Sequence, residues 1–161
     1  MVKKEATGTR PSALSPWFRE KLGNNVAISD IDFVITSISN KDESSRYLII
    51  EEKNTSNPEQ LLLGYGQART LVEISRMLQT YPLIRQESVK LNIPIFAIFV
   101  VNENITNGVY LYELDSNHIQ DPDNYTKMDG NTYVNVKKYA TLYSEEDLVK
   151  KLLSTVNGSH N

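Results

Sequence analysis

The sequence predicts an α/β domain in which helices flank a mixed central β-sheet. Three observations support this fold class. Predicted elements follow the order α-β-β-α-β-β with a C-terminal helix, and such alternation is typical of helices packed on the faces of a sheet. The run Ile93–Val101 is apolar at every position, as in a strand buried on both faces. A length of 161 residues with 40% hydrophobic content suits one domain with one core.

The first predicted elements are an arm and a short helix. Residues 1–12 are polar and lack an apolar period, so we expect a flexible arm. The stretch SPWFREKLG follows, with Ser15 placed to cap a helix, Pro16 at its first position and Gly23 placed to end it. The domain therefore begins with a helix.

Two strands come next. The run Val26–Ile38 is rich in β-branched residues, SNKDESS reads as a polar turn, and RYLIIEEK, residues 46–53, is a second strand. The short polar turn between two apolar runs predicts an antiparallel hairpin.

A long helix is expected after the hairpin. Asn57 is placed as its cap, Pro58 as its first residue and Gln60 as the third residue after the cap, and the pattern extends to about Tyr81. Four apolar residues fall on one stripe at helical spacing: Leu63, Leu71, Ile74 and Leu78. Gln60 and Gln67 interrupt that stripe.

The C-terminal part continues the sheet. Residues 108–114 form another expected strand, a turn-rich loop follows, and residues 132–143 alternate weakly. Ser144, followed by three acidic residues, starts a final helix. We expect a single domain over residues 13–156 and a short tail over 157–161.

Composition narrows the function. The chain has no cysteine, which excludes thiol nucleophiles and thiolate zinc sites, and it has only two histidines. No window approaches the roughly 18 apolar residues of a membrane span, so we expect a soluble, intracellular protein, cytoplasmic or nuclear, without membrane contact. The net charge of −3 argues against a dedicated nucleic-acid binder unless the acids are concentrated at a metal site.

Charged residues end the second strand of the hairpin. Glu51 and Lys53 share one face of the strand, about 6.6 Å apart, while Glu52 points to the other face. Asp30 and Asp32, also two residues apart, lie on the preceding strand. The hairpin brings them opposite Glu51 and Lys53 at about 4.8 Å strand spacing. Three carboxylates and one ammonium are therefore expected to converge.

Such a cluster needs compensation, because like charges repel and burial disfavours ionised carboxylates. A divalent cation provides it, since Mg²⁺ takes one or two protein carboxylates and completes its shell with water and phosphate oxygens. A bound metal can activate water and stabilise charge on a phosphodiester. Lys53 is placed to orient that water or to neutralise the transition state.

Asp32 followed by FVI, and then YLIIEEK with its Glu51-x-Lys53, resembles the PD-(D/E)xK nuclease superfamily, nearest to RecB-type and type I restriction nuclease domains. The resemblance covers roughly residues 15–101 and implies a restriction-endonuclease-like core. Its implied catalytic set is Asp32, Glu51, Lys53 and Gln67, with Gln60 the less favoured counterpart of Gln67. Its implied metal ligands, for Mg²⁺ or Mn²⁺, are Asp32 and Glu51 with the auxiliary Glu20. The hairpin geometry, independently of the resemblance, adds Asp30 as a candidate ligand.

The expected function is metal-dependent hydrolysis of phosphodiester bonds in nucleic acid, with DNA favoured and a homodimer or larger protein partner plausible. One alternative is a catalytically silent nuclease-like module for binding or assembly, and another is an unrelated α/β protein. Individual residues also have simpler interpretations. Asp30 can be a strand-start residue, Glu20 and Glu52 solvated charges, and Gln67 a buried amide satisfied by backbone.

Overall fold

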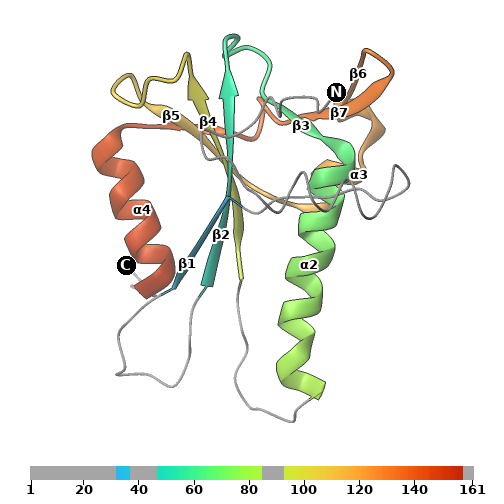
Figure 1. Cartoon of the computed structure of the whole chain (residues 1–161), viewed down its shortest axis with the longest axis vertical. Helices are drawn as coiled ribbons and strands as arrows, with labels where there is room; N and C mark the ends of the chain where they lie inside the picture. Colours follow the sequence, from blue (N-terminus) through green and yellow to red (C-terminus); the bar gives the residue numbers. More distant parts are fainter. Residues whose placement is uncertain (1–31, 37–46, 85–92, 158–161) are drawn as a thin grey trace, which may run out of the picture. The chain divides into compact units, whose positions relative to one another are not determined.

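The computed structural model describes residues 32–36, 47–84 and 93–157. The predicted arm, the first helix, Glu20 and Asp30 lie outside the described residues. The described part is an α/β domain with a mixed five-stranded sheet in the order β1-β2-β4-β5-β8 (Figure 1). Its strands are β1 (Phe33–Thr36), β2 (Tyr47–Thr55), β4 (Ile95–Val101), β5 (Val109–Glu113) and β8 (Thr141–Tyr143).

The centre of the sheet is β4, as its continuous apolar run predicts. It pairs in parallel with β2, from Ile49 opposite Ile95 to Thr55 opposite Val101, and antiparallel with β5. Its first six residues are buried. The predicted hairpin is also present, because β1 pairs antiparallel with β2.

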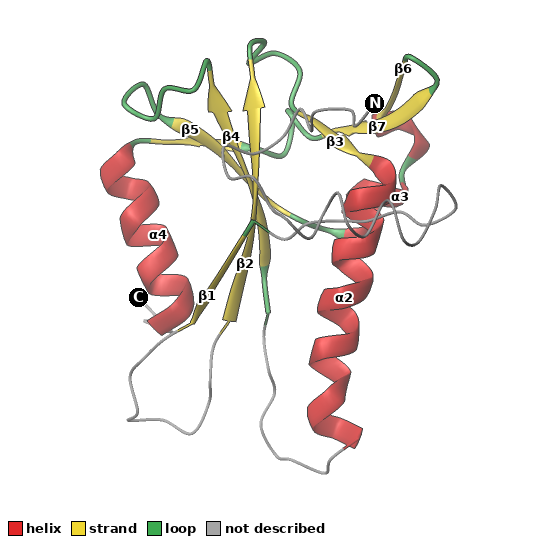
Figure 2. Cartoon of the chain, viewed as in Figure 1, coloured by secondary structure: helices red, strands yellow, loops and turns green. Residues whose placement is uncertain are grey.

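Helices α2 (Tyr65–Ile84) and α4 (Glu145–Asn157) cover opposite faces of this sheet (Figure 2). On one face, Leu48 and Ile50 of β2 belong to a buried cluster against which Leu148 and Leu152 of α4 pack. On the other, Ile49 of β2 clusters with Leu71 of α2. Alternate residues of β2 thus face different helices. Among the described helices, none is both long and apolar enough to cross a membrane.

The last helix begins where the sequence predicts. The hydroxyl Oγ of Ser144 accepts a hydrogen bond from the backbone N–H of Asp147 at 3.2 Å and donates to the Asp147 carboxylate at 2.9 Å. This reciprocal pair satisfies one of the free N–H groups of the first turn.

The predicted start of the long helix at Pro58 is wrong, because α2 begins at Tyr65. The Asn57 side chain accepts from Glu59 N at 3.1 Å, and Gln60 N donates to Asn57 O at 3.2 Å, so these residues form a turn. Asn and Pro favour turns as readily as helix starts. The chain then forms β3 (Leu62–Gly64), which pairs with β7 (Asn131–Asn135).

The predicted apolar stripe is therefore also wrong in part. Leu63 lies in β3, and Leu78 is 42% exposed. Ala68 and Leu71, both buried, lie on the side of α2 that faces the sheet. Ser75 is on the same side, and its hydroxyl donates to Ile93 O at 2.8 Å.

A second, three-stranded sheet in the order β3-β7-β6 was not predicted. The region expected to be a loop contains α3 (Ser116–Gln120), a 3-10 turn at Pro122–Asn124 and β6 (Tyr125–Met128). Its core joins that of the main sheet, because Val134 and Val136 are fully buried in the cluster that contains Ala97 and Phe99 of β4.

Candidate active site

The candidate site begins with the alternation of charged residues at the end of β2. Glu51 is only 3% exposed, whereas Glu52 is exposed. Glu51 and Lys53 occupy the same face as Ile49, the face toward α2. The Lys53 ammonium Nζ donates to Glu51 Oε1 at 2.6 Å. The predicted acidic and basic pair therefore exists as a direct contact on a largely buried surface.

Gln67 joins this pair from the first turn of α2. Its amide Nε2 donates to the same Glu51 Oε1 that accepts from Lys53. The neighbouring Ala68 and Leu71 are 1% exposed and fix this part of the helix against the sheet. The partner of Gln67 is thus the Glu51 carboxylate, rather than the backbone group that a structural amide would use.

Asp32 lies immediately before β1. The register that pairs Phe33 with Ile50 brings Asp32 beside Glu51, and cross-strand neighbours project from the same face. Asp32 Oδ2 accepts a hydrogen bond from the backbone N–H of Glu52 at 2.7 Å. The end of the hairpin therefore holds two carboxylates next to each other.

Burial dominates the electrostatics of Glu51. Desolvation raises the pKa of this carboxyl above its ordinary value, and the nearby charge of Asp32 raises it further. The hydrogen bonds from Lys53 and Gln67 and the charge of Lys53 act in the opposite direction without cancelling the effect. Both hydrogen bonds reach Oε1, while Oε2 is buried and has no hydrogen-bond partner among the described residues. An unpaired buried carboxylate oxygen is costly, so Oε2 lacks a compensating partner among the described residues.

The donor set fits a hard divalent cation. Asp32 and Glu51 offer carboxylate oxygens, and Mg²⁺ takes one or two such ligands before water and phosphate complete its shell. Within residues 32–36, 47–84 and 93–157, no group of three or more His, Cys, Asp or Glu side chains is arranged to hold a metal. Two predicted ligands, Glu20 and Asp30, lie outside those ranges. The less favoured Gln60 is exposed in the turn before β3.

Sequence reasoning missed a polar cluster around His118. Its ring stacks on Tyr139 with centroids 3.6 Å apart, and its Nδ1 lies 3.3 Å from the Tyr112 hydroxyl. Burial raises the pKa of Tyr112 to about 12. Asn124, 4% exposed, donates to His118 O at 2.8 Å. No serine joins these contacts in the described part of the chain, and the cluster ties α3 to the strands beside it.

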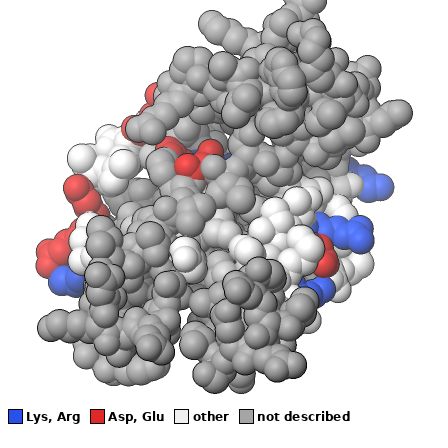
Figure 3. Space-filling view, turned by 60° about the horizontal axis from the view of Figure 1, so that its bottom comes forward, with Lys and Arg blue, Asp and Glu red and all other residues white. Residues whose placement is uncertain are grey.

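Charge on the described surface is mixed. On the face drawn in Figure 3, the described Lys and Arg side chains are interspersed with Asp and Glu. A phosphate would therefore be recognised by local contacts rather than by a broad positive field. Comparisons of the chain with protein-family models, with curated proteins and with solved structures find no match.

Proposed function

We propose that this domain has a restriction-endonuclease-like core and acts as a metal-dependent nuclease of the PD-(D/E)xK type, cutting phosphodiester bonds in nucleic acid, with DNA as the favoured substrate. The observation that carries the proposal is that Lys53 and Gln67 both donate to the Glu51 carboxylate, whose Oε2 is buried and unpaired among the described residues, while the backbone N–H of Glu52 holds Asp32 beside it. These groups come from the residue before β1, from β2 and from α2, so their proximity depends on the fold and not on sequence adjacency.

Each side chain at the site has a distinct role. A bound Mg²⁺ or Mn²⁺ supplies Lewis-acid stabilisation of the phosphate and a water of lowered pKa. Asp32 and Glu51 would hold that ion, and Gln67 fixes the rotamer of Glu51 through its amide. The Lys53 ammonium, 18% exposed, neutralises charge that develops on a phosphate oxygen and orients the attacking water. Because the pKa of Glu51 is raised, a proton would compete with the ion for this carboxylate more strongly than for an ordinary glutamate.

A catalytically silent binding or assembly module is the second candidate. It is favoured by a single observation, that the described residues bring only two carboxylates to the site. It requires neither metal nor cleavage. A homodimer or a larger protein partner is compatible with either function.

The deciding test uses the full chain and labelled single-stranded, duplex and branched DNA and RNA, with Mg²⁺, Mn²⁺ or EDTA. We expect metal-dependent cleavage that falls by about 100-fold or more in Lys53→Ala, the range typical of lost proton-transfer or charge-stabilising groups. The matched control is Lys150→Ala, which removes a lysine paired with Glu146 at 2.7 Å on exposed α4. A folded wild type that cuts nothing on any substrate would refute the nuclease proposal and leave the silent module.

A further inference from the structure

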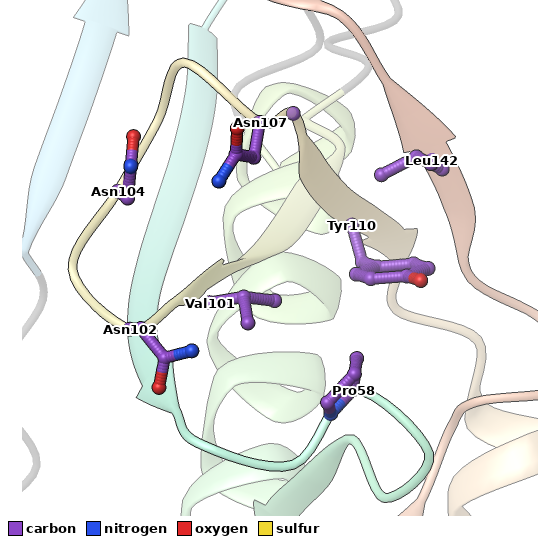
Figure 4. Close-up of a pocket in the computed structure, with 8 residues that line it drawn as sticks. Pro58, Val101, Asn102, Asn104, Asn107, Tyr110 and Leu142 are labelled. Atoms are coloured by element: carbon purple, nitrogen blue, oxygen red, sulfur yellow. The ribbon is translucent and has the colours of Figure 1, made fainter.

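A second concave site lies at the carboxyl end of β4. It has a volume of about 440 Å³ and is enclosed by the turn after β2, the loop between β4 and β5, and β8 (Figure 4). β2 and β4 are the parallel pair of the sheet, and both end beside this loop, where Asn102 N donates to Thr55 O at 2.8 Å. Ligands of open α/β sheets bind outside the carboxyl ends of the strands, and the volume falls in the usual range for such sites.

The lining carries no formal charge. Pro58, Val101 and Leu142 form apolar walls, and the ring of Tyr110 forms a flat one. The ammonium Nζ of Lys137 stands 4.0 Å from the centroid of the Tyr110 ring without lining the pocket. Such a wall suits a neutral, planar group. An uncharged lining does not suit a metal ion or a free phosphate.

Asparagine side chains supply the polar contacts. Asn102 and Asn107 line the pocket, and neither amide has a hydrogen-bond partner among the described residues. Asn104 differs, because its Oδ1 accepts from Thr106 N at 2.9 Å and from Thr106 Oγ1 at 2.6 Å, and Figure 4 shows it on the far side of the loop from Tyr110. A free amide offers two donors and an acceptor, the complement of a base edge.

The backbone holds Asn102 in place. Its φ of 50° and that of Glu103, 57°, are left-handed, and the turn is closed by Asn104 N donating to Val101 O at 3.1 Å. Asparagine tolerates this conformation better than most residues. With Asn102 N bound to Thr55 O, the amide side chain projects from a backbone fixed on both sides.

The pocket shares a sheet face with the candidate active site. Lys53 of β2 pairs with Phe99 of β4, and Phe99 pairs with Tyr110 of β5, so the three side chains form one row. Two strand spacings separate Lys53 from Tyr110, about 10 Å. Phe99 between them is 1% exposed, so a stacked single strand that joins Lys53 to Tyr110 passes over the residues that cover Phe99 and needs at least about three nucleotides.

We propose that this pocket receives a nucleobase of the strand whose phosphate lies at Glu51 and Lys53. The base stacks on Tyr110 and hydrogen-bonds to Asn102 and Asn107. This inference rests on the proposed function and deepens it, because it adds a base to the phosphate as a recognised group.

The test compares how tightly the full chain binds two labelled strands, a 12-nucleotide single strand and the same strand with all bases removed. Binding is measured by fluorescence anisotropy in EDTA. We expect the full chain to bind the base-containing strand at least about tenfold more tightly. Asn102→Gly, which suits the left-handed backbone, and Asn107→Ala each weaken that strand about five- to tenfold and leave the abasic strand unchanged. The control is Asn117→Ala, an exposed asparagine on α3.

Equal affinity for the two strands, or equal weakening of both by the Asn102 and Asn107 variants, would overturn the proposal. A nucleoside monophosphate that binds as tightly as the strand would identify free nucleotide as the ligand and overturn the placement of a strand. The two proposals fail separately. Base-dependent binding without cleavage would refute only the nuclease, whereas Lys53-dependent cleavage without base dependence would refute only the pocket.

Discussion

Glu51→Gln should have opposite effects on stability with and without metal. In the metal-free protein, the Glu51 carboxyl is 3% exposed, its Oε2 has no partner among the described residues, and its folded-state pKa is raised above the ordinary 4.5. A raised pKa means that the protonated form is favoured in the fold. The stability that Glu51 contributes is therefore fully present below pH 4.5 and is lost as the pH rises through the folded-state pKa.

Above its folded-state pKa, Glu51 is an ionised and only partly paired carboxylate in the metal-free fold. Glutamine has the same shape and no charge. Removing the buried charge relieves its desolvation penalty, about 1–3 kcal/mol, which corresponds to a rise in melting temperature of about 2–12 °C for a domain of this size. We expect this difference to shrink as the pH approaches 4.5, because wild-type Glu51 then becomes neutral as well.

With metal bound, wild type should become more stable than Glu51→Gln. With Mn²⁺ at about 100 times its dissociation constant, wild type gains about 2.7 kcal/mol, or about 5–11 °C. Glu51→Gln lacks the anionic ligand and should gain little. Differential scanning fluorimetry at pH 5 and pH 8, with EDTA or a Mn²⁺ titration, measures both effects.

The matched control for this experiment is Glu52→Gln, which removes the neighbouring acid from the exposed face of β2 and should follow wild type in every condition. A Glu51→Gln variant that is less stable than wild type at pH 8 in EDTA would refute the electrostatic reasoning. A wild type that Mn²⁺ does not stabilise would refute the metal site.

Two further predictions concern the fold. Gly108 has φ +90°, and a β-carbon added to it would lie only 2.8 Å from the backbone oxygen of Tyr143, so Gly108→Ala should lower the free energy of unfolding by about 1–3 kcal/mol. Gly66→Ala, which has open space around it in α2, should raise that free energy by up to about 1 kcal/mol. Equal effects of the two substitutions in chemical denaturation would contradict this difference. The pKa of Tyr112, raised to about 12, means that its contribution to stability is intact below pH 10 and is lost toward pH 12. Wild type should therefore lose about 2–3 kcal/mol more than Tyr112→Phe over that interval, and parallel curves of unfolding free energy against pH would disprove this.

The parts of the fold that were predicted correctly have strong, regular signals. A run with no polar residue from Ile93 to Val101 predicts a central strand, because both of its faces must be buried. The alternation of Glu51, Glu52 and Lys53 predicts which side chains share a face, and the hairpin predicts that Asp32 lies beside Glu51. These inferences need only the period of a strand and one short connection.

The parts that were predicted wrongly depend on contacts between distant residues. Asn57 and Pro58 satisfy the rules for a helix start, yet they form a turn here. The reason is that the backbone of Leu61 and Leu63 pairs with residues far along the chain. Leu63 pairs with Val134, and Val136 N donates to Leu61 O at 2.9 Å, so residues about 70 positions later decide that this stretch is a strand. Local patterns contain no information on that pairing. The pocket at Asn102 was missed for the same reason, since its walls come from the turn after β2, the loop between β4 and β5, and the strands β5 and β8.

The small residues of the core explain how Gln67 comes to contact Glu51. Within the apolar strand β4, the residue paired with Glu51 is Ala97, which is fully buried, and the residue after Gln67 on α2 is Ala68, 1% exposed. Both alanines belong to the same buried cluster. Two methyl side chains at this level let the first turn of the helix approach the sheet more closely than Ile or Phe would allow. The polar contact at Glu51 is therefore built by apolar packing, and a larger residue at position 97 would separate Gln67 from the carboxylate it orients.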